Sequence, residues 1–222
     1  MISILISILF WIIAFVVAIT VHEAAHAYMS DRLGDPTARL AGRLSLNPLV
    51  HYDPVGTTLL LVLVLMRAFG IPVIPFGWAK PVMFDPYNLK NPKRDSAIIS
   101  LAGPASNLIL AVIIAIILRF LYSPFSPVTF IYALAFPLIV INVALAIFNL
   151  IPIHPLDGGK ILIGLLPNKE GLQLDRFLNH YGLIILFFLI FPTIGGSSLV
   201  SIIISPIINL LLQILAPASS IV

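Results

Sequence analysis

Long apolar stretches without charge constrain this chain more than any other feature. A helix that crosses a bilayer needs about 20 apolar residues, and lipid offers no hydrogen-bond partners to an exposed backbone. Five stretches are long and apolar enough to enter or cross a membrane: Met1–Val21, Pro54–Pro75, Ser96–Leu118, Phe120–Ile153 and Tyr181–Val222. Arg67 is the only charged residue in them. The sequence therefore predicts an all-α polytopic membrane protein.

The composition favours one membrane-embedded domain. The chain is 60% hydrophobic and 9% charged, whereas soluble domains carry about 25% charged residues. We expect a single domain over 1–222, with a core at about 1–165. Pro192 and Gly195 interrupt the last apolar stretch, which predicts a C-terminal helical hairpin at about 180–216. Cysteine is absent, and this excludes thiolate metal ligands.

Basic residues predict how the chain is oriented, because Lys and Arg concentrate in the cytoplasmic loops of membrane proteins. They fill three polar loops: Arg32, Arg39 and Arg43, then Lys80, Lys90, Lys93 and Arg94, then Lys160, Lys169 and Arg176. This distribution indicates topology and no nucleic-acid partner. If the first two loops share a side, Pro54–Pro75 must enter the membrane and return as a re-entrant loop. An ordinary span with one basic loop outside is the alternative.

Two polar segments lack helical character. Arg39–Asn47 alternates roughly between apolar and polar residues, and Val73–Phe84 contains Pro75, Gly77 and Pro81. Such segments are typical of short strands or extended chain. We expect both to be extended.

The motif His22-Glu23-Ala24-Ala25-His26 directly follows the first uncharged stretch. Ionisable groups inside a membrane are costly and usually functional. Histidines four residues apart share one helix face and can reach one metal ion, and the glutamate between them is the general base of zinc hydrolases. The motif predicts His22 and His26 as metal ligands and Glu23 as the catalytic base. Two histidines packed in a core are the alternative.

Catalytic zinc usually takes three protein ligands and leaves one position for water. Asp157 is the candidate for the third, because it follows the fourth apolar stretch at a depth that matches His22 and His26. A solvated Asp-Gly turn is the alternative. Glu170 is the other candidate, but it lies in the polar stretch Leu166–Arg176, far from any predicted helix face. We expect one Zn²⁺ per chain.

These residues carry a resemblance to a known family. HExxH at the end of a membrane helix, followed by Asn149-x-x-Pro-x-x-x-x-Asp157-Gly, resembles the site-2 protease family of intramembrane zinc metalloproteases. Gly103-Pro-Ala-Ser-Asn107 resembles the family's intermediate G-x-x-x-[NSG] motif. The segments HEAAHAYMSDRLGDPTARLAGRLSLNPLVHYDPVGT and PFGWAKPV resemble its compact bacterial and archaeal branch. The resemblance covers roughly residues 18–165.

The resemblance implies a core of three helices that brings two His ligands, a catalytic Glu and an Asp ligand together. In this chain they are His22, His26, Glu23 and Asp157. Asn149 would then steady the developing oxyanion or the substrate carbonyl. Asn107 and His154 are further candidates for contacts to the substrate or the oxyanion. His51 could line the site, although a role in shaping its own loop is the simpler expectation.

The predicted function is intramembrane proteolysis: hydrolysis of peptide bonds within or near transmembrane segments of membrane proteins, in a prokaryotic cell membrane, with the active site toward the cytoplasm. A transmembrane substrate must unwind before attack, so its span should contain helix-weakening residues, and Val73–Phe84 could offer it a strand edge. The alternative is a membrane transporter or metal-ion carrier with a His/Asp cluster. A carrier does not need a base beside the first histidine.

Overall fold

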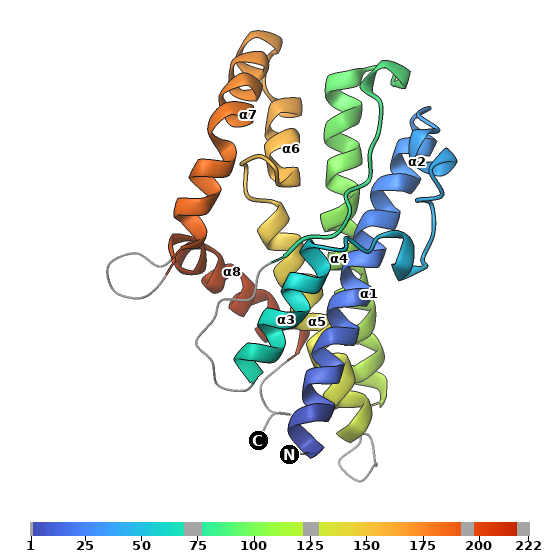
Figure 1. The fold of residues 1–222 in the computed structure, drawn as a ribbon, viewed down its shortest axis with the longest axis vertical. Coiled ribbons are helices and arrows are strands. Elements are labelled where there is room, and N and C mark those ends of the chain that lie inside the picture. Colours follow the sequence, from blue (N-terminus) through green and yellow to red (C-terminus); the bar gives the residue numbers. More distant parts are fainter. Residues whose placement is uncertain (1, 69–76, 122–128, 192–197, 217–222) are drawn as a thin grey trace.

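The computed structural model describes residues 2–68, 77–121, 129–191 and 198–216 (Figure 1). These residues form helices joined by extended chain, and no β-sheet occurs among them. The α-helices are α1 (Ile2–Arg32), α2 (Thr37–Leu40), α3 (Gly56–Ala68), α4 (Pro92–Leu121), α5 (Thr129–Asn149), α6 (Asp157–Leu165), α7 (Asn168–Ile190) and α8 (Leu199–Leu215). Two short 3-10 turns, η1 (Pro48–Val50) and η2 (Pro86–Asn88), lie in the polar loops.

Three of these helices are long and apolar enough to cross a membrane: Leu5–Arg32, Pro92–Phe120 and Ile131–Asn149. They belong to α1, α4 and α5, which pack against one another in the lower half of the molecule (Figure 1). The prediction of an all-α polytopic membrane protein is therefore confirmed.

Small side chains allow α4 and α5 to pack closely. Ala111 and Ala115 of α4 and Ala135 of α5 are buried together with Ile139 and Val143, and α8 covers this cluster. Lipid tails are as apolar as leucine, so helices in a membrane associate through close packing instead of the hydrophobic effect. This packing fixes α5, whose end leads to Asp157.

The three basic loops meet at one end of the molecule. Asp35, after α1, accepts hydrogen bonds from the backbone N–H of Asp85 and from the side chain of Asn88, each at 2.8 Å, both in the segment before α4. At the start of α4, Lys93 donates to the carbonyl of Leu166 and, at 3.2 Å, to Asn168 at the junction of α6 and α7. All three loops therefore share one end, as the charge pattern predicts.

Asp35 is fully buried in this arrangement. Burial by itself raises the pKa of the carboxyl, but hydrogen bonds from Thr37, Asn88 and Asp85 outweigh it and lower the pKa to about 2. Asp35 is therefore an ionised carboxylate that fastens the end of α1 to the segment leading into α4.

The start of helix α3 lies beside residues 78–80, to which the chain returns after this helix. Its 13 residues extend about 20 Å, which is less than the roughly 30 Å of the hydrocarbon core. The hydroxyl of Thr57 donates to the carbonyl of Trp78 at 3.2 Å, and the N–H of Lys80 donates to the carbonyl of His51 at 3.0 Å. Entry and exit thus lie together, which is the geometry that a re-entrant loop requires. Residues 69–76 lie outside the described residues.

Two local expectations need correction. Arg39 and Leu40, which were expected to be extended, lie in the short helix α2. The described part of Val73–Phe84, residues 77–84, contains neither helix nor strand and agrees with the expected extended chain. The stretch Leu166–Arg176 was interpreted as lying far from any helix face, yet α7 begins at Asn168, about 12 residues before the expected hairpin. Its polar side chains are exposed on one face while Gly171 and Leu178 are buried on the other, so the helix forms without an apolar sequence.

Candidate metal centre and active-site cavity

Helix α1 presents His22 and His26 one turn apart, and α4 fixes both rings. His22 Nδ1 lies 2.7 Å from Oδ1 of Asn107, and His26 Nδ1 lies 2.8 Å from the carbonyl oxygen of Ile99. A carbonyl oxygen only accepts hydrogen bonds, so each Nδ1 carries the proton. Each Nε2 is then a free lone pair, which is the form that binds a metal.

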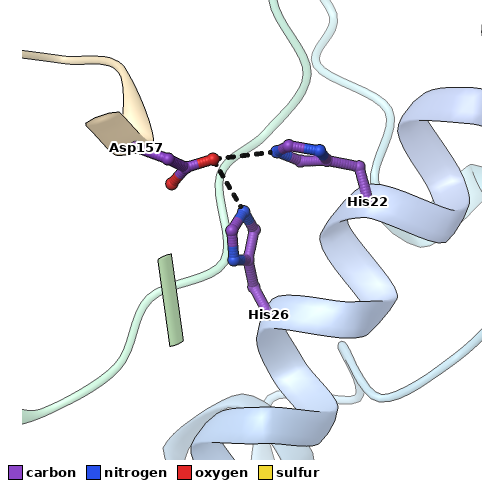
Figure 2. Close-up of side chains that lie close together, drawn as sticks. All are labelled: His22, His26 and Asp157. Carbon is purple, nitrogen blue, oxygen red and sulfur yellow. Dashed lines mark hydrogen bonds and ion pairs between the residues drawn. The ribbon is translucent and has the colours of Figure 1, made fainter. Parts of the chain in front are cut away.

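Asp157 closes the group from the start of α6. Figure 2 shows one carboxylate oxygen, Oδ2, approaching both rings: it lies 3.1 Å from Nε2 of His22 and 3.3 Å from Nε2 of His26. Two ligands bound to zinc at about 2.1 Å and separated by the tetrahedral angle lie about 3.4 Å apart. Both distances from Asp157 match that spacing, and all three ligand atoms lie within 4.8 Å of one another, so the group could hold a zinc ion.

Gly103 gives the histidines their space. A Cβ atom at this position would lie 2.5 Å from Nε2 of His26 and 2.7 Å from Cε1 of His22. Any larger residue would push one ring away from Asp157. The glycine of the intermediate motif is therefore required by the close approach of α4 to the two rings.

Asn107 of α4 is the partner of His22 Nδ1. It is fully buried, and its amide group donates to the carbonyl of Ala18 at 2.9 Å and to Oδ1 of Asn142 at 2.7 Å. No part of the amide is left for a substrate. Asn107 is not among the residues that line the cavity, and its described hydrogen bonds are with His22, Ala18 and Asn142.

A cavity of about 140 Å³ lies in front of the two rings. It is lined by His22, Glu23, His26, Pro81, Val82, Phe84, Ile99, Ser100, Asn149, Pro155, Asp157 and Lys160. Glu23 accepts a hydrogen bond from the backbone N–H of Val82 at 2.9 Å. One water occupies about 30 Å³ in the liquid, so the cavity has room for a few waters or one peptide group.

Of the other predicted residues, Asn149 lines the cavity, whereas His154 and His51 do not. Asn149 lines the cavity as expected, although its amide nitrogen also donates to the carbonyl of Leu145 at 2.9 Å. His154 instead faces α7, with Nε2 3.6 Å from Asp175, which moves it away from the expected substrate site. His51 is buried, and its Nε2 lies 2.9 Å from the carbonyl oxygen of Ser45. It shapes its own loop.

Sequence reasoning missed several residues of the site, among them Ile99, whose carbonyl oxygen lies 2.8 Å from Nδ1 of His26. Asn142 supports Asn107, Val82 contacts Glu23 through its backbone, and Lys160 lines the cavity. Only Lys160 carried a usable signal. It follows Asp157 by three residues, and residues at that spacing share a helix face.

Comparison with known proteins identifies relatives. The model of peptidase family M50 matches residues 123–192. YwhC of Bacillus subtilis (strain 168), named as a zinc metalloprotease, is 38% identical over 183 residues, which cover 80% of this chain and 78% of YwhC. Rip2 of Mycolicibacterium smegmatis, named likewise, is 34% identical over 145 residues, or 63% of this chain and 51% of Rip2.

An archaeal protein is also similar. The zinc metalloprotease MJ0392 of Methanocaldococcus jannaschii is 35% identical over 82 residues, which cover 37% of this chain and 23% of MJ0392. No solved structure matches this chain. The relatives therefore come from bacteria and archaea alike.

Proposed function

Since the chain belongs to peptidase family M50, we propose that it is an intramembrane zinc metalloprotease whose motif His22–His26 carries the catalytic groups. The observation that supports this most is the convergence of His22, His26 and Asp157 beside Glu23, in a cavity between helices long enough to span a bilayer. The curated relatives are named as zinc metalloproteases, which supports zinc as the metal.

The proposed ligands of one zinc ion per chain are His22, His26 and Asp157. Their donor set suits zinc, because both imidazoles are held as neutral Nε2 donors and the carboxylate oxygen lies between them. Zinc, when bound, supplies positive charge that polarises a carbonyl and acidifies water.

Glu23 is the proposed general base. It takes a proton from the attacking water as a C–O bond forms at the scissile carbonyl, and it returns the proton to the amine as the C–N bond breaks. The N–H of Val82 donates to Oε2 of Glu23 at 2.9 Å, so Oε1 has no part in this hydrogen bond and is the oxygen proposed to accept the proton. Asn149 lines the same cavity and is the proposed donor to the substrate carbonyl.

The proposed substrate is a membrane protein whose transmembrane segment is weakened by Gly, Pro or similar residues. The extended segment 77–85 supports this, because it runs along the cavity through Pro81, Val82 and Phe84. The backbones of Lys80 and Val82 donate inward, to His51 and Glu23. Alternation along an extended chain turns the N–H group of Met83, an exposed residue, to the opposite edge, which an unwound peptide can pair with.

The three basic loops at one end favour a cytoplasmic position for that end and for the active site near it, in the cell membrane of a prokaryote. The transporter alternative has less support, because Glu23 points into the cavity beside the ligands, where a carrier needs no base.

The test of this function is cleavage of a synthetic single-span peptide by the purified chain in vesicles. We expect a chelator to abolish cleavage, and Glu23→Gln to keep the zinc but lower kcat by about 10²- to 10⁴-fold, because only proton transfer is removed. Asp157→Ala should lose the zinc. Full cleavage by Glu23→Gln, or full zinc occupancy in Asp157→Ala, would contradict the assignment.

A further inference from the structure

Lys160 is the one cation among the residues that line the cavity. It lies on α6, three residues after Asp157, so both side chains project from the same face of the helix. The cavity also holds the carboxylates of Glu23 and Asp157. The fold therefore brings a positive charge to the place where the proposed reaction occurs.

The ammonium group of Lys160 has an unusual environment. Its nitrogen lies 4.8 Å from the centre of the Phe84 ring, which contributes a face of negative potential. An ammonium carries three N–H donors, and among the described residues none of them has a hydrogen-bond acceptor. Lys93 differs, because it donates to both Leu166 and Asn168 across a loop junction. Lys93 thus has a structural role, whereas the donors of Lys160, a residue that lines the cavity, have no acceptor among the described residues.

Peptide hydrolysis places negative charge in this cavity twice. The carbonyl oxygen gains charge as water attacks, and the product is a carboxylate. A charged donor fixed in a low-dielectric site stabilises such charge without rearrangement of solvent. Asn149, the other candidate donor, is neutral and already donates to Leu145.

We propose that Lys160 is a catalytic residue that donates a hydrogen bond to the carbonyl oxygen of the peptide group being cleaved, and then to the carboxylate product. This inference rests on the proposed protease function. The overall step stays a hydrolysis: one water is consumed, the C–N bond breaks, and Lys160 keeps its proton throughout.

The first test compares variants of the full chain in vesicles. Lys160→Met removes the charge at similar length, Lys160→Arg keeps it, and Lys169→Met removes an exposed lysine from α7 as the matched control. With a single-span peptide that has a central Gly-Pro pair, Lys160→Met should keep its zinc and lose about 10²-fold in kcat with little change in KM. Lys160→Arg should recover most of the loss. A kcat within about threefold of wild type, or loss of zinc, would overturn the proposal.

A binding measurement tests the proposal without turnover. Wild type should bind a short apolar peptide ending in a carboxylate more tightly than the same peptide ending in a carboxamide. Lys160→Met should reduce this preference by about tenfold, and Lys169→Met should not. An unchanged preference in Lys160→Met would refute the role of Lys160. A wild-type protein that cleaves nothing would refute the protease function instead.

Phe84→Leu distinguishes a catalytic role of Lys160 from a purely structural one. It removes the aromatic ring that the ammonium group contacts and leaves the ammonium group itself. If Lys160 served only to hold segment 77–85, Phe84→Leu would lower kcat as much as Lys160→Met does. We expect Phe84→Leu to retain the preference for the carboxylate peptide.

Discussion

At the scale of single residues, the site depends on the residues that hydrogen-bond to the proposed ligands His22 and His26 or leave room for their rings. Asn107 and Ile99 set the tautomers of His22 and His26 through their Nδ1 atoms, and Gly103 gives both rings room. Partners of this kind typically change metal affinity by about 10- to 100-fold when they are removed. All three residues belong to α4. This helix contributes no proposed ligand itself, but its contacts orient His22 and His26, the proposed ligands on α1.

Replacement of Gly103 tests this control. Gly103→Ala should lower zinc affinity by at least about tenfold, because the new Cβ would lie 2.5 Å from Nε2 of His26. Alanine favours a helix over glycine by about 1 kcal/mol, so helix stability by itself predicts no loss. Zinc titration checks the result, with Ser106→Ala one turn further along α4 as the control. Unchanged zinc affinity in Gly103→Ala would contradict the close approach.

At the scale of elements, segment 77–85 joins the re-entrant region to α4 and passes the cavity. Its contacts tie three parts together: Lys80 to the loop before α3, Val82 to α1, and Asp85 to Asp35. An extended chain exposes its two edges to different neighbours. One edge holds Glu23, the proposed catalytic base, and the other is the proposed edge for the substrate.

Two proline substitutions separate these edges. Val82→Pro removes the N–H that holds Glu23 and should lower kcat by about tenfold or more, because the base loses its orientation. Met83→Pro removes an N–H on the opposite edge from an exposed residue, and it should raise KM with less effect on kcat. Steady-state kinetics on one peptide measures both.

The matched controls are Val82→Ala and Met83→Ala, which keep the backbone donors. Zinc content should stay at the wild-type level in all four variants. The interpretation is that one edge of segment 77–85 orients Glu23 and the other pairs with the substrate. It is wrong if both proline variants change the same kinetic parameter, or if the alanine variants have the same effects as the proline variants.

At the scale of the whole molecule, the polar loops form one end and the spanning helices extend away from it (Figure 1). Asp35 links the loop after α1 to the segment before α4, and Lys93 links α4 to the α6–α7 junction. These links require the three loops to lie on the same side of the membrane, whichever way the protein is inserted.

Cysteine labelling tests this topology, and the chain contains no cysteine of its own. Leu40, Tyr87 and Leu172 are 76%, 95% and 60% exposed, one in each loop region. A membrane-impermeant maleimide should label Leu40→Cys, Tyr87→Cys and Leu172→Cys from the same side, which we expect to be the cytoplasmic one. Labelling of positions 40 and 87 from opposite sides would rule out the re-entrant path.

The sequence by itself determined the fold class and the residues from which the chemistry of the site is proposed. Uncharged stretches must become helices where lipid offers the backbone no partners, and the spacing of His22 and His26 already places both on one helix face. Their nearness to Asp157 was predicted from its matching depth, and the structure brings the three together. These features depend on local periodicity and on solvent, which a single sequence displays.

Only the tertiary structure decided how the other residues serve that chemistry. The roles of Asn107, Asn142, Val82 and Lys160 depend on which helix lies beside which, and this arrangement is set by close packing between segments far apart in the chain. Val82 acts through its backbone, so its side chain gives no sign of the contact. His154 illustrates the reverse case, because Asp157, three residues later, lies beside His22 and His26 while His154 faces Asp175 on α7.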